Sequence, residues 1–119
     1  MLYELREYHC VPGRLPELID RFQTQTTVLW RELGIRPVAF FTTVIGPSST
    51  RLTYLLEWAS LAERERLWEL FLKDSRWLAI RTQTEAAGPL IEFVDNRIMA
   101  PCIITPRIEA PWSSPVSER

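Results

Sequence analysis

Two stretches of the chain, residues 38–45 and 52–58, offer apolar or aromatic side chains to both of the faces that a β-strand presents. A strand that is packed on one face and wetted on the other alternates apolar with polar residues. Runs of this kind therefore predict a sheet that is covered on both faces. Because the sequence has only two regions with helical periodicity, we expect a second copy of the chain to supply the other cover.

The first half of the chain predicts a strand, a helix and a strand hairpin. Residues 2–10 are rich in β-forming residues, and Pro12-Gly13 ends the run with a turn. Apolar residues at three- and four-residue spacing predict a helix over 15–33, with Gly34 where a C-terminal cap belongs. A loop at 46–49 should join the strands 38–45 and 52–58 into a hairpin.

The second half predicts one more helical region and one more strand. Ser60 and Glu63 form a capping box, and the helix that follows should be interrupted near 74–75 and end at Gly88-Pro89. A fourth strand is expected over 90–98. Prolines crowd the end of the chain, so we expect one domain over residues 1–100 and a Pro-rich C-terminal arm and tail over 101–119.

The element order βαββαβ predicts an α+β fold, a ferredoxin-like sandwich with a four-stranded antiparallel sheet and both helical layers on one side. The other face of the sheet would be bare. Two sheets that pair face to face would bury it in a homodimer. The expectation rests on apolar residues of the hairpin strands that would make a large exposed patch on a monomer: Phe40, Phe41, Tyr54, Leu55, Leu56 and Trp58.

Composition excludes several classes of partner. The 119 residues suit one domain, and the formal charge of -1 includes no basic run that would neutralise a nucleic-acid backbone. No apolar stretch approaches the roughly 18 residues that span a bilayer, so no membrane partner is expected. The N-terminus is strand-like and charged, unlike a signal peptide, and Cys10 and Cys102 are expected as reduced thiols. We therefore expect a cytoplasmic protein.

Several short motifs follow one another in a specific order: Tyr3-Glu4-Leu5-Arg6-Glu7-Tyr8, Pro12-Gly13, Gly34-Ile35-Arg36-Pro37-Val38 with Phe40-Phe41-Thr42, Leu52-Thr53-Tyr54-Leu55-Leu56, Trp58-Ala59-Ser60-Leu61-Ala62-Glu63-Arg64, and Asn96-Arg97-Ile98-Met99 with Pro101. As an ordered set they resemble the NIPSNAP family, from the N-terminus to about residue 101. The resemblance implies a dimeric α+β barrel, in agreement with the strand pattern. It implies no catalytic constellation that could be placed on numbered residues.

The first strand carries more polar residues than a central strand should bury. Period-two geometry places Glu4, Arg6 and Tyr8 on one face, and Tyr3, Leu5, Glu7 and His9 on the other. On a structural interpretation Glu4 and Arg6 form an ion pair, which Glu57 could join. On a functional interpretation they form a polar floor that orients a ligand. The structural interpretation is the favoured one.

The candidate catalytic residues all lie on this strand. His9 is the only histidine, and Glu7 on the same face could orient it or share its proton. Tyr8 or Arg6 could steady developing negative charge. No metal site is expected, because His9, Cys10 and Cys102 lack the spacing of a structural zinc site. No cofactor is expected either, since no glycine-rich phosphate loop or dinucleotide fingerprint is present.

Aromatic residues suggest where a ligand could bind. Trp30, Trp58, Trp68 and Trp77 could line a cleft between helices and sheet, although Trp68 and Trp77 are expected in the core. Arg81 could cap such a cleft. Tyr3 is a further candidate for ligand contact, beside Trp30, Trp58 and Arg81.

Three functional hypotheses remain open. The favoured one is a dimeric protein that binds a small apolar or aromatic molecule. The second is a cofactor-free enzyme, of cyclase, isomerase or monooxygenase type, with His9 as acid or base. The third is a protein-interaction module that uses the arm at 101–119.

Overall fold

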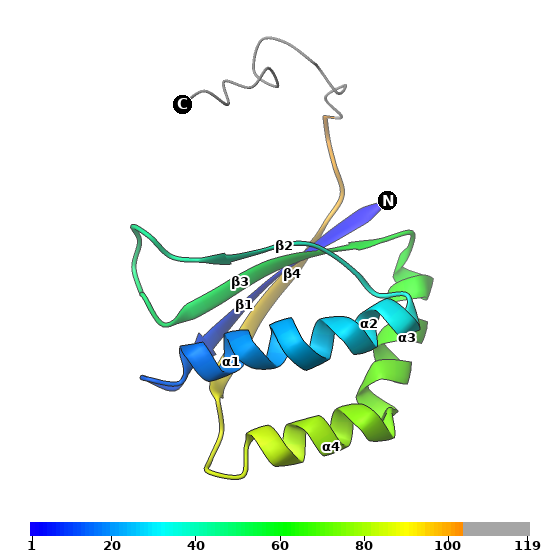
Figure 1. The fold of residues 1–119 in the computed structure, drawn as a ribbon. Helices are drawn as coiled ribbons and strands as arrows, with labels where there is room; N and C mark the ends of the chain where they lie inside the picture. Colours follow the sequence, from blue (N-terminus) through cyan, green and yellow to red (C-terminus); the bar gives the residue numbers. More distant parts are fainter. Residues whose placement is uncertain (104–119) are drawn as a thin grey trace, which may run out of the picture.

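A computed structural model describes residues 1–103 of the chain and confirms the α+β, ferredoxin-like fold. Four antiparallel strands form one sheet in the order β2-β3-β1-β4, and the helices lie on one side of it (Figure 1). The elements are β1 (Leu2–Cys10), α1 (Leu15–Arg21), η1 (Phe22–Thr26), α2 (Thr27–Leu33), β2 (Arg36–Thr42), β3 (Arg51–Trp58), α3 (Leu61–Lys73), α4 (Ser75–Thr84) and β4 (Ile91–Met99). The hypothesis of an interaction module falls mostly on residues 104–119, outside the described residues.

The two central strands are β1 and β3, as the topology predicts. They pair antiparallel with Arg6 opposite Tyr54 and Tyr8 opposite Leu52. On its other edge β1 pairs with β4, so Arg6 also lies opposite Asn96. Because side chains alternate along each strand, this register gathers the polar residues of three strands on the helix-covered face.

The core lies between this face and the helices. Its centre is aromatic: Phe22 packs against Trp30 and Tyr54 with ring centroids 5.6 and 5.2 Å away. Side chains from every layer surround this group and are buried: Tyr8, Leu18, Leu29, Ile35, Leu52, Leu56, Trp58, Leu67, Phe71 and Leu90. One contiguous core thus holds the helices on the sheet.

We call the helix-free side of the sheet the open face, and it is less apolar than the sequence suggests. In β3, burial alternates residue by residue, and Tyr54, Leu56 and Trp58 all lie beneath the helices. Phe40 packs there too, with its ring 5.0 Å from Tyr54. The expected exposed patch of six residues is therefore wrong, since only Phe41 and Leu55 of that set lie on the open face.

The expectation that residues 52–58 are apolar on both faces is wrong for the same reason. Leu55 is the single apolar residue of β3 on the open face, where it lies between Thr53 and Glu57. Because the neighbours of Leu55 are the buried Tyr54 and Leu56, the sequence shows three large apolar side chains in a row and hides the regular alternation. The strand is thus amphipathic, and the open face combines apolar with charged residues.

The first helical region is continuous but not regular. A π-helical segment, η1, separates α1 from α2, and the Thr27 hydroxyl donates to the carbonyl of Phe22 at 2.8 Å within it. Gly34 ends the region in the left-handed conformation, with φ of 92°, and its N–H donates to the carbonyl of Trp30 at 2.9 Å. The predicted glycine cap is confirmed.

The second helical region begins and breaks where the sequence predicts. The Glu63 N–H donates to the Ser60 hydroxyl at 3.1 Å, while the Glu63 carboxylate accepts from the Ala59 N–H at 2.8 Å. Asp74 ends α3 and caps α4, accepting from the Arg76 N–H at 2.8 Å. Over residues 1–103, none of the helices combines the length and hydrophobicity that crossing a lipid bilayer requires.

We expect the substitution Gly34→Ala to destabilise the fold by about 1 kcal/mol, because only glycine adopts the left-handed region without strain. A Cβ at this position would meet its nearest heavy atom, Leu67 Cδ1, at 3.9 Å, so the cost isolates backbone conformation from crowding. Urea denaturation measures it. Gly34→Asn is the control and should cost less, because asparagine tolerates this conformation. Equal losses for both variants would contradict the assignment.

Candidate functional site

A buried carboxylate organises the polar residues beneath the helices. The Glu4 side chain has no exposure to solvent and accepts from the Arg64 Nε at 2.7 Å and from the Arg6 Nη1 at 3.0 Å. The indole N–H of Trp58 donates to it at 3.0 Å, and the Asn96 amide at 2.9 Å. The expected Glu4–Arg6 ion pair is confirmed. The acceptor and one donor lie on β1, and the other donors lie on β3, β4 and α3. Of the four strands in residues 1–103, β2 alone contributes nothing to this group.

The polar group continues toward the middle of the sheet. Arg6 Nε donates to the Tyr54 hydroxyl at 2.9 Å, and the hydroxyls of Tyr54 and Tyr8 are 2.8 Å apart. The guanidinium of Arg6 also stacks 4.7 Å from the ring centroid of Trp68. We call these connected side chains the Glu4 network: Glu4, Arg6, Tyr8, Tyr54, Trp58, Arg64 and Asn96.

Ionisation in the Glu4 network follows from its partners. Burial alone would raise the pKa of Glu4, but hydrogen bonds from Arg64 and Asn96 and the charges of Arg6 and Arg64 lower it from 4.5 to about 2. Burial raises the pKa of the Tyr54 hydroxyl well above 10.0, and the neighbouring Tyr8 adds to that rise. At neutral pH Glu4 is therefore charged and Tyr54 keeps its proton.

Glu57 does not join this network. It lies on the open face, opposite Arg36 in the neighbouring strand, with its carboxylate 3.6 Å from the Arg36 guanidinium. The suggestion that Glu57 extends the Glu4–Arg6 pair is wrong, because period-two alternation sends Glu57 and Glu4 to opposite faces of the sheet.

A cleft of about 330 Å³ opens beside the network, between the helices and the β4 side of the sheet. Aromatic rings form much of its wall, with Phe22, Trp30, Phe71 and Trp77 from the helices and Tyr8 from β1. We call it the aromatic cleft. Its size is near the lower end of the range for small-molecule sites, about 300–1,000 Å³.

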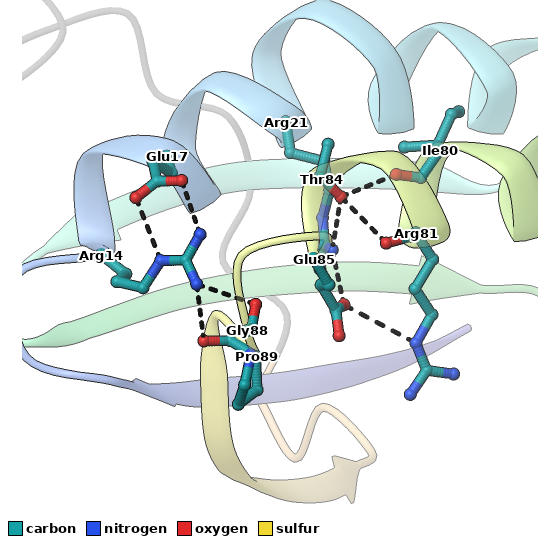
Figure 2. Close-up of polar contacts among 9 residues, drawn as sticks. All are labelled: Arg14, Glu17, Arg21, Ile80, Arg81, Thr84, Glu85, Gly88 and Pro89. Carbon is teal, nitrogen blue, oxygen red and sulfur yellow. Dashed lines mark hydrogen bonds and ion pairs between the residues drawn. The ribbon is translucent and has the colours of Figure 1, made fainter.

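Arg21 forms part of the inner wall of the aromatic cleft. Although charged, it is only 3 % exposed, and its Nη1 donates to the Thr84 hydroxyl at 3.1 Å and to the Glu85 carboxylate at 2.9 Å (Figure 2). Its guanidinium lies 5.0 Å from the ring centroid of Trp77. The same Glu85 carboxylate is 3.6 Å from Arg81 Nε, so two guanidinium groups share one carboxylate.

A second arginine fixes the segment that closes the end of the cleft. Arg14 Nη1 donates to the carbonyls of Gly88 and Pro89 at 2.8 and 3.2 Å, while two of its nitrogens hold Glu17 (Figure 2). Pro89 itself lines the cleft. The segment between α4 and β4 is thereby attached to the start of α1.

Three lining residues carry buried polar atoms that lack a partner. Within residues 1–103, Arg21 Nε, Thr26 Oγ1 and Trp30 Nε1 make no hydrogen bond and have almost no area open to water, as does Arg51 Nε on the open face. The first three belong to residues that line the aromatic cleft. A buried polar group left unpaired costs about 1–3 kcal/mol, and such groups in native proteins call for an explanation.

The irregular helix explains how these three residues come to line one cleft. Arg21 ends α1, Thr26 ends η1 and Trp30 lies in α2. In a regular α-helix, residues 21 and 30 are nine positions apart and point in opposite directions, about 180° from each other. The wider turn of η1 changes that angle, and π-helical turns are frequent at functional sites.

His9 lies on the open face and does not line the aromatic cleft. Its Nε2 is 2.8 Å from the Asp95 carboxylate, and its ring stacks on Phe93 with centroids 4.0 Å apart. The expected partner Glu7 instead faces Arg51, at 3.6 Å. The suggested His9–Glu7 pair is therefore wrong, because Asp95 of β4, which lies opposite Glu7 in the strand register, reaches the imidazole instead.

The structure divides the other candidates from the sequence. Tyr8, Trp30 and Arg81 line the aromatic cleft, and so does Trp77, which the sequence placed in the core. Trp58 is fully buried and serves the Glu4 network, as does Arg6. Tyr3 is half-buried on the open face, opposite Glu57. Within residues 1–103 no three His, Cys, Asp or Glu side chains gather to hold a metal ion.

Sequence reasoning missed Arg21 and Thr26. A signal for Arg21 was present, because it follows Leu18 by three residues and so lies on the apolar face of the helix. For Thr26 the only hint is the polar run at 23–27, which interrupts the apolar spacing between Phe22 and Leu29. Neither hint distinguishes a cleft residue from a surface residue.

The family model for NIPSNAP matches residues 3–106. This chain belongs to the NIPSNAP family. The predicted resemblance is thus confirmed over nearly the whole chain. A search of curated proteins gave no match.

Solved structures agree with the family assignment. A NIPSNAP family protein from Agrobacterium tumefaciens is 26% identical, with a TM-score of 0.77 over 88% of this chain and 96% of that one. A second from the same organism, described as of unknown function, is 27% identical, with a TM-score of 0.75 over 89% of this chain and 92% of that one. An antibiotic biosynthesis monooxygenase shares the fold, at 10% identity and a TM-score of 0.58 over 87% and 100%.

We expect the Glu4 carboxylate to stabilise the protein in a pH-dependent way. Because folding lowers its pKa from 4.5 to about 2, its contribution is complete above about pH 4.5 and is lost as the pH falls toward 2. The shift corresponds to about 3 kcal/mol. Glu4→Gln should therefore lower the free energy of unfolding at neutral pH, and the deficit against wild type should shrink at about pH 3.

Urea denaturation of both proteins across this pH range tests the expectation. Glu69→Gln is the matched control, because the Glu69–Lys73 pair is exposed on α3 and should contribute little. A deficit for Glu4→Gln that stays constant with pH would show that the carboxylate acts through packing rather than charge.

Proposed function

We propose that this NIPSNAP protein binds a small, flat aromatic molecule in the aromatic cleft. The observation that carries the proposal is the composition of the cleft wall, in which aromatic rings surround buried polar atoms that have no partner. Small-molecule sites combine mostly apolar walls with a few convergent polar groups. Arg21, Thr26 and Trp30 each line the cleft and each keep one buried polar atom without a partner, which is rare in native proteins.

Other hollows of the surface lack this combination. A groove of about 480 Å³ follows α3, but a single helix lines it, with side chains such as Glu65, Arg66 and Lys73. An apolar groove of about 300 Å³ between η1 and the β2–β3 side holds no buried unpaired atom among its lining residues. Neither surface offers both shape and polar recognition.

The position of His9 argues for binding rather than for the catalysis that the sequence suggested. His9 and Glu7 lie on the open face, whereas the aromatic cleft lies under the helices. Tyr54, the buried hydroxyl nearest to Tyr8, remains protonated at neutral pH. The likeness to an antibiotic biosynthesis monooxygenase is one of fold and assigns no reaction here.

Binding of 2-acetonaphthone, a flat aromatic ketone, tests the proposal. We expect NMR shift changes in the indole signals of Trp30 and Trp77, and loss of the Trp77 ring should weaken binding by roughly tenfold because stacking on it is lost. Trp77→Ala is compared with Phe41→Ala, which removes an exposed ring from the open face and should leave affinity unchanged. His9→Ala should leave it unchanged too. Shift changes confined to the open face would contradict the proposal.

We also propose that two copies pair through their open faces, in the cytoplasm. No helix covers this face in residues 1–103, and Phe41 and Phe93 are each 54 % exposed on it. Its charges are mixed in sign, with Arg51 near Glu7 and Arg36 near Glu57, so a second copy can meet them without net repulsion. The thiols of Cys10 and Cys102 are free, as in proteins of a reducing compartment.

Light scattering after gel filtration should give twice the mass of the chain, because a permanent pair buries about 1,600 Å² or more. Leu55→Arg should shift this to the mass of one chain by placing a charge in the centre of the open face. Val28→Arg, on the exposed side of α2, is the control and should keep the pair. A single-chain mass for wild type would refute the pairing.

A further inference from the structure

If the aromatic cleft binds a small molecule, as proposed above, the polar side chains of its wall also determine which chemical class of molecule it binds. We propose that the ligand carries a hydrogen-bond-acceptor oxygen on its aromatic or conjugated frame, as in an aryl ketone, a quinone or an aryl carboxylate. Arg21, Thr26 and Trp30 are the residues that would donate hydrogen bonds to this oxygen.

The unpaired atoms of the cleft wall are biased toward donors. The guanidinium Nε–H of Arg21 and the indole N–H of Trp30 can only donate a hydrogen bond, while the Thr26 hydroxyl can donate or accept. Because these atoms have almost no area open to water, a ligand oxygen meets them only when side chains of the cleft wall turn, and it then supplies the acceptor that they lack. A ligand that presents an amine at the same place leaves both N–H groups without an acceptor.

The lining charges do not oppose this class of ligand. Arg21 is the buried charge of the wall, and the Glu85 carboxylate pairs with it. Arg81 and Glu92 also line the cleft, but both side chains are exposed, so water screens their charges. An oxygen that reaches Arg21 Nε meets a positively charged donor, whereas an ammonium group there meets a like charge.

The walls restrict the frame that carries the oxygen. Phe71 and Trp77 lie 4.7 Å apart between ring centroids, and Trp77 in turn packs on Arg21. Trp30 meets Phe71 edge to face at 5.7 Å. A flat frame can stack along these rings with its oxygen toward Arg21, so shape and hydrogen bonding select together.

Four naphthalene probes that differ in one substituent test the proposal by calorimetry on the full chain. They are naphthalene, 2-naphthylamine, the neutral ketone 2-acetonaphthone and the anion 2-naphthoate. We expect the two oxygen-bearing probes to bind roughly tenfold more tightly than naphthalene and 2-naphthylamine, the gain of one or two hydrogen bonds to otherwise unpaired donors. Tighter binding of either oxygen probe supports the proposal, and their order tells whether the oxygen is charged.

Thr26→Val separates recognition from stability. Valine has the same shape without the hydroxyl, so the preference for 2-acetonaphthone over naphthalene should fall roughly two- to tenfold while naphthalene affinity stays the same. Because the hydroxyl is buried without a partner, the ligand-free variant should melt at the same temperature as wild type or higher. Thr53→Val on the open face is the matched control for recognition and should leave the preference for 2-acetonaphthone over naphthalene unchanged.

The two proposals fail in different ways. If both oxygen-bearing probes bound no more tightly than naphthalene, the role of these residues in recognising an oxygen would be overturned and aromatic binding would remain intact. A preference for 2-naphthylamine would overturn it as well. If none of the four probes bound, both the ligand class and the binding function would be refuted.

Discussion

The arrangement of the sheet and of α3 depends on the buried carboxylate of Glu4. A charge without solvent contact is tolerated only when hydrogen bonds surround it. Here the donors come from Arg6 on its own strand, Trp58 on β3, Asn96 on β4 and Arg64 on α3. Any slip in strand register by one residue would send Glu4 to the open face and leave these donors without their acceptor. The Glu4 network thus specifies both the pairing of β1 with its neighbouring strands and the position of α3 on the sheet.

The helix-covered face has two halves. In one half the buried polar groups have hydrogen-bond partners, and in the other half several have none. Around Glu4 no buried side-chain nitrogen or oxygen of the network lacks a hydrogen-bond partner. On the other side of Tyr8, the donors of Arg21 and Trp30 point to no protein acceptor. Tyr8 belongs to both halves, because its hydroxyl meets Tyr54 and its ring borders the cleft. A fully hydrogen-bonded half can hold the residues of the unpaired half in position, as the supporting residues of a preorganised binding site do.

Much of the fold could be predicted from the sequence, and the reasons are local. The element order, the glycine cap at Gly34, the capping box at Ser60 and the break at Asp74 each depend on a few neighbouring residues. The Glu4–Arg6 pair followed from period-two spacing alone. Errors came where contacts join distant segments: Asp95 rather than Glu7 meets His9, and Arg36 rather than Arg6 meets Glu57. Spacing along one strand does not show what the next strand brings opposite it. The cleft was only partly foreseen, through Trp30 and Arg81, because Arg21 and Thr26 owe their positions to an irregular helix that no spacing rule predicts.

The π-helical segment also bears on how this chain compares with its relatives. In an ordinary α-helix, residues 18 and 30 are twelve positions apart and point about 120° away from each other, and one extra residue in a wide turn reduces that difference to about 20°. Leu18 and Trp30 are both buried against the sheet as a result. A relative that is one residue shorter between 22 and 26 would keep the same fold and the same Glu4 network, yet would need no wide turn. Chain length in this segment is therefore a marker, readable from sequence alone, for which family members need the wide turn that carries Thr26.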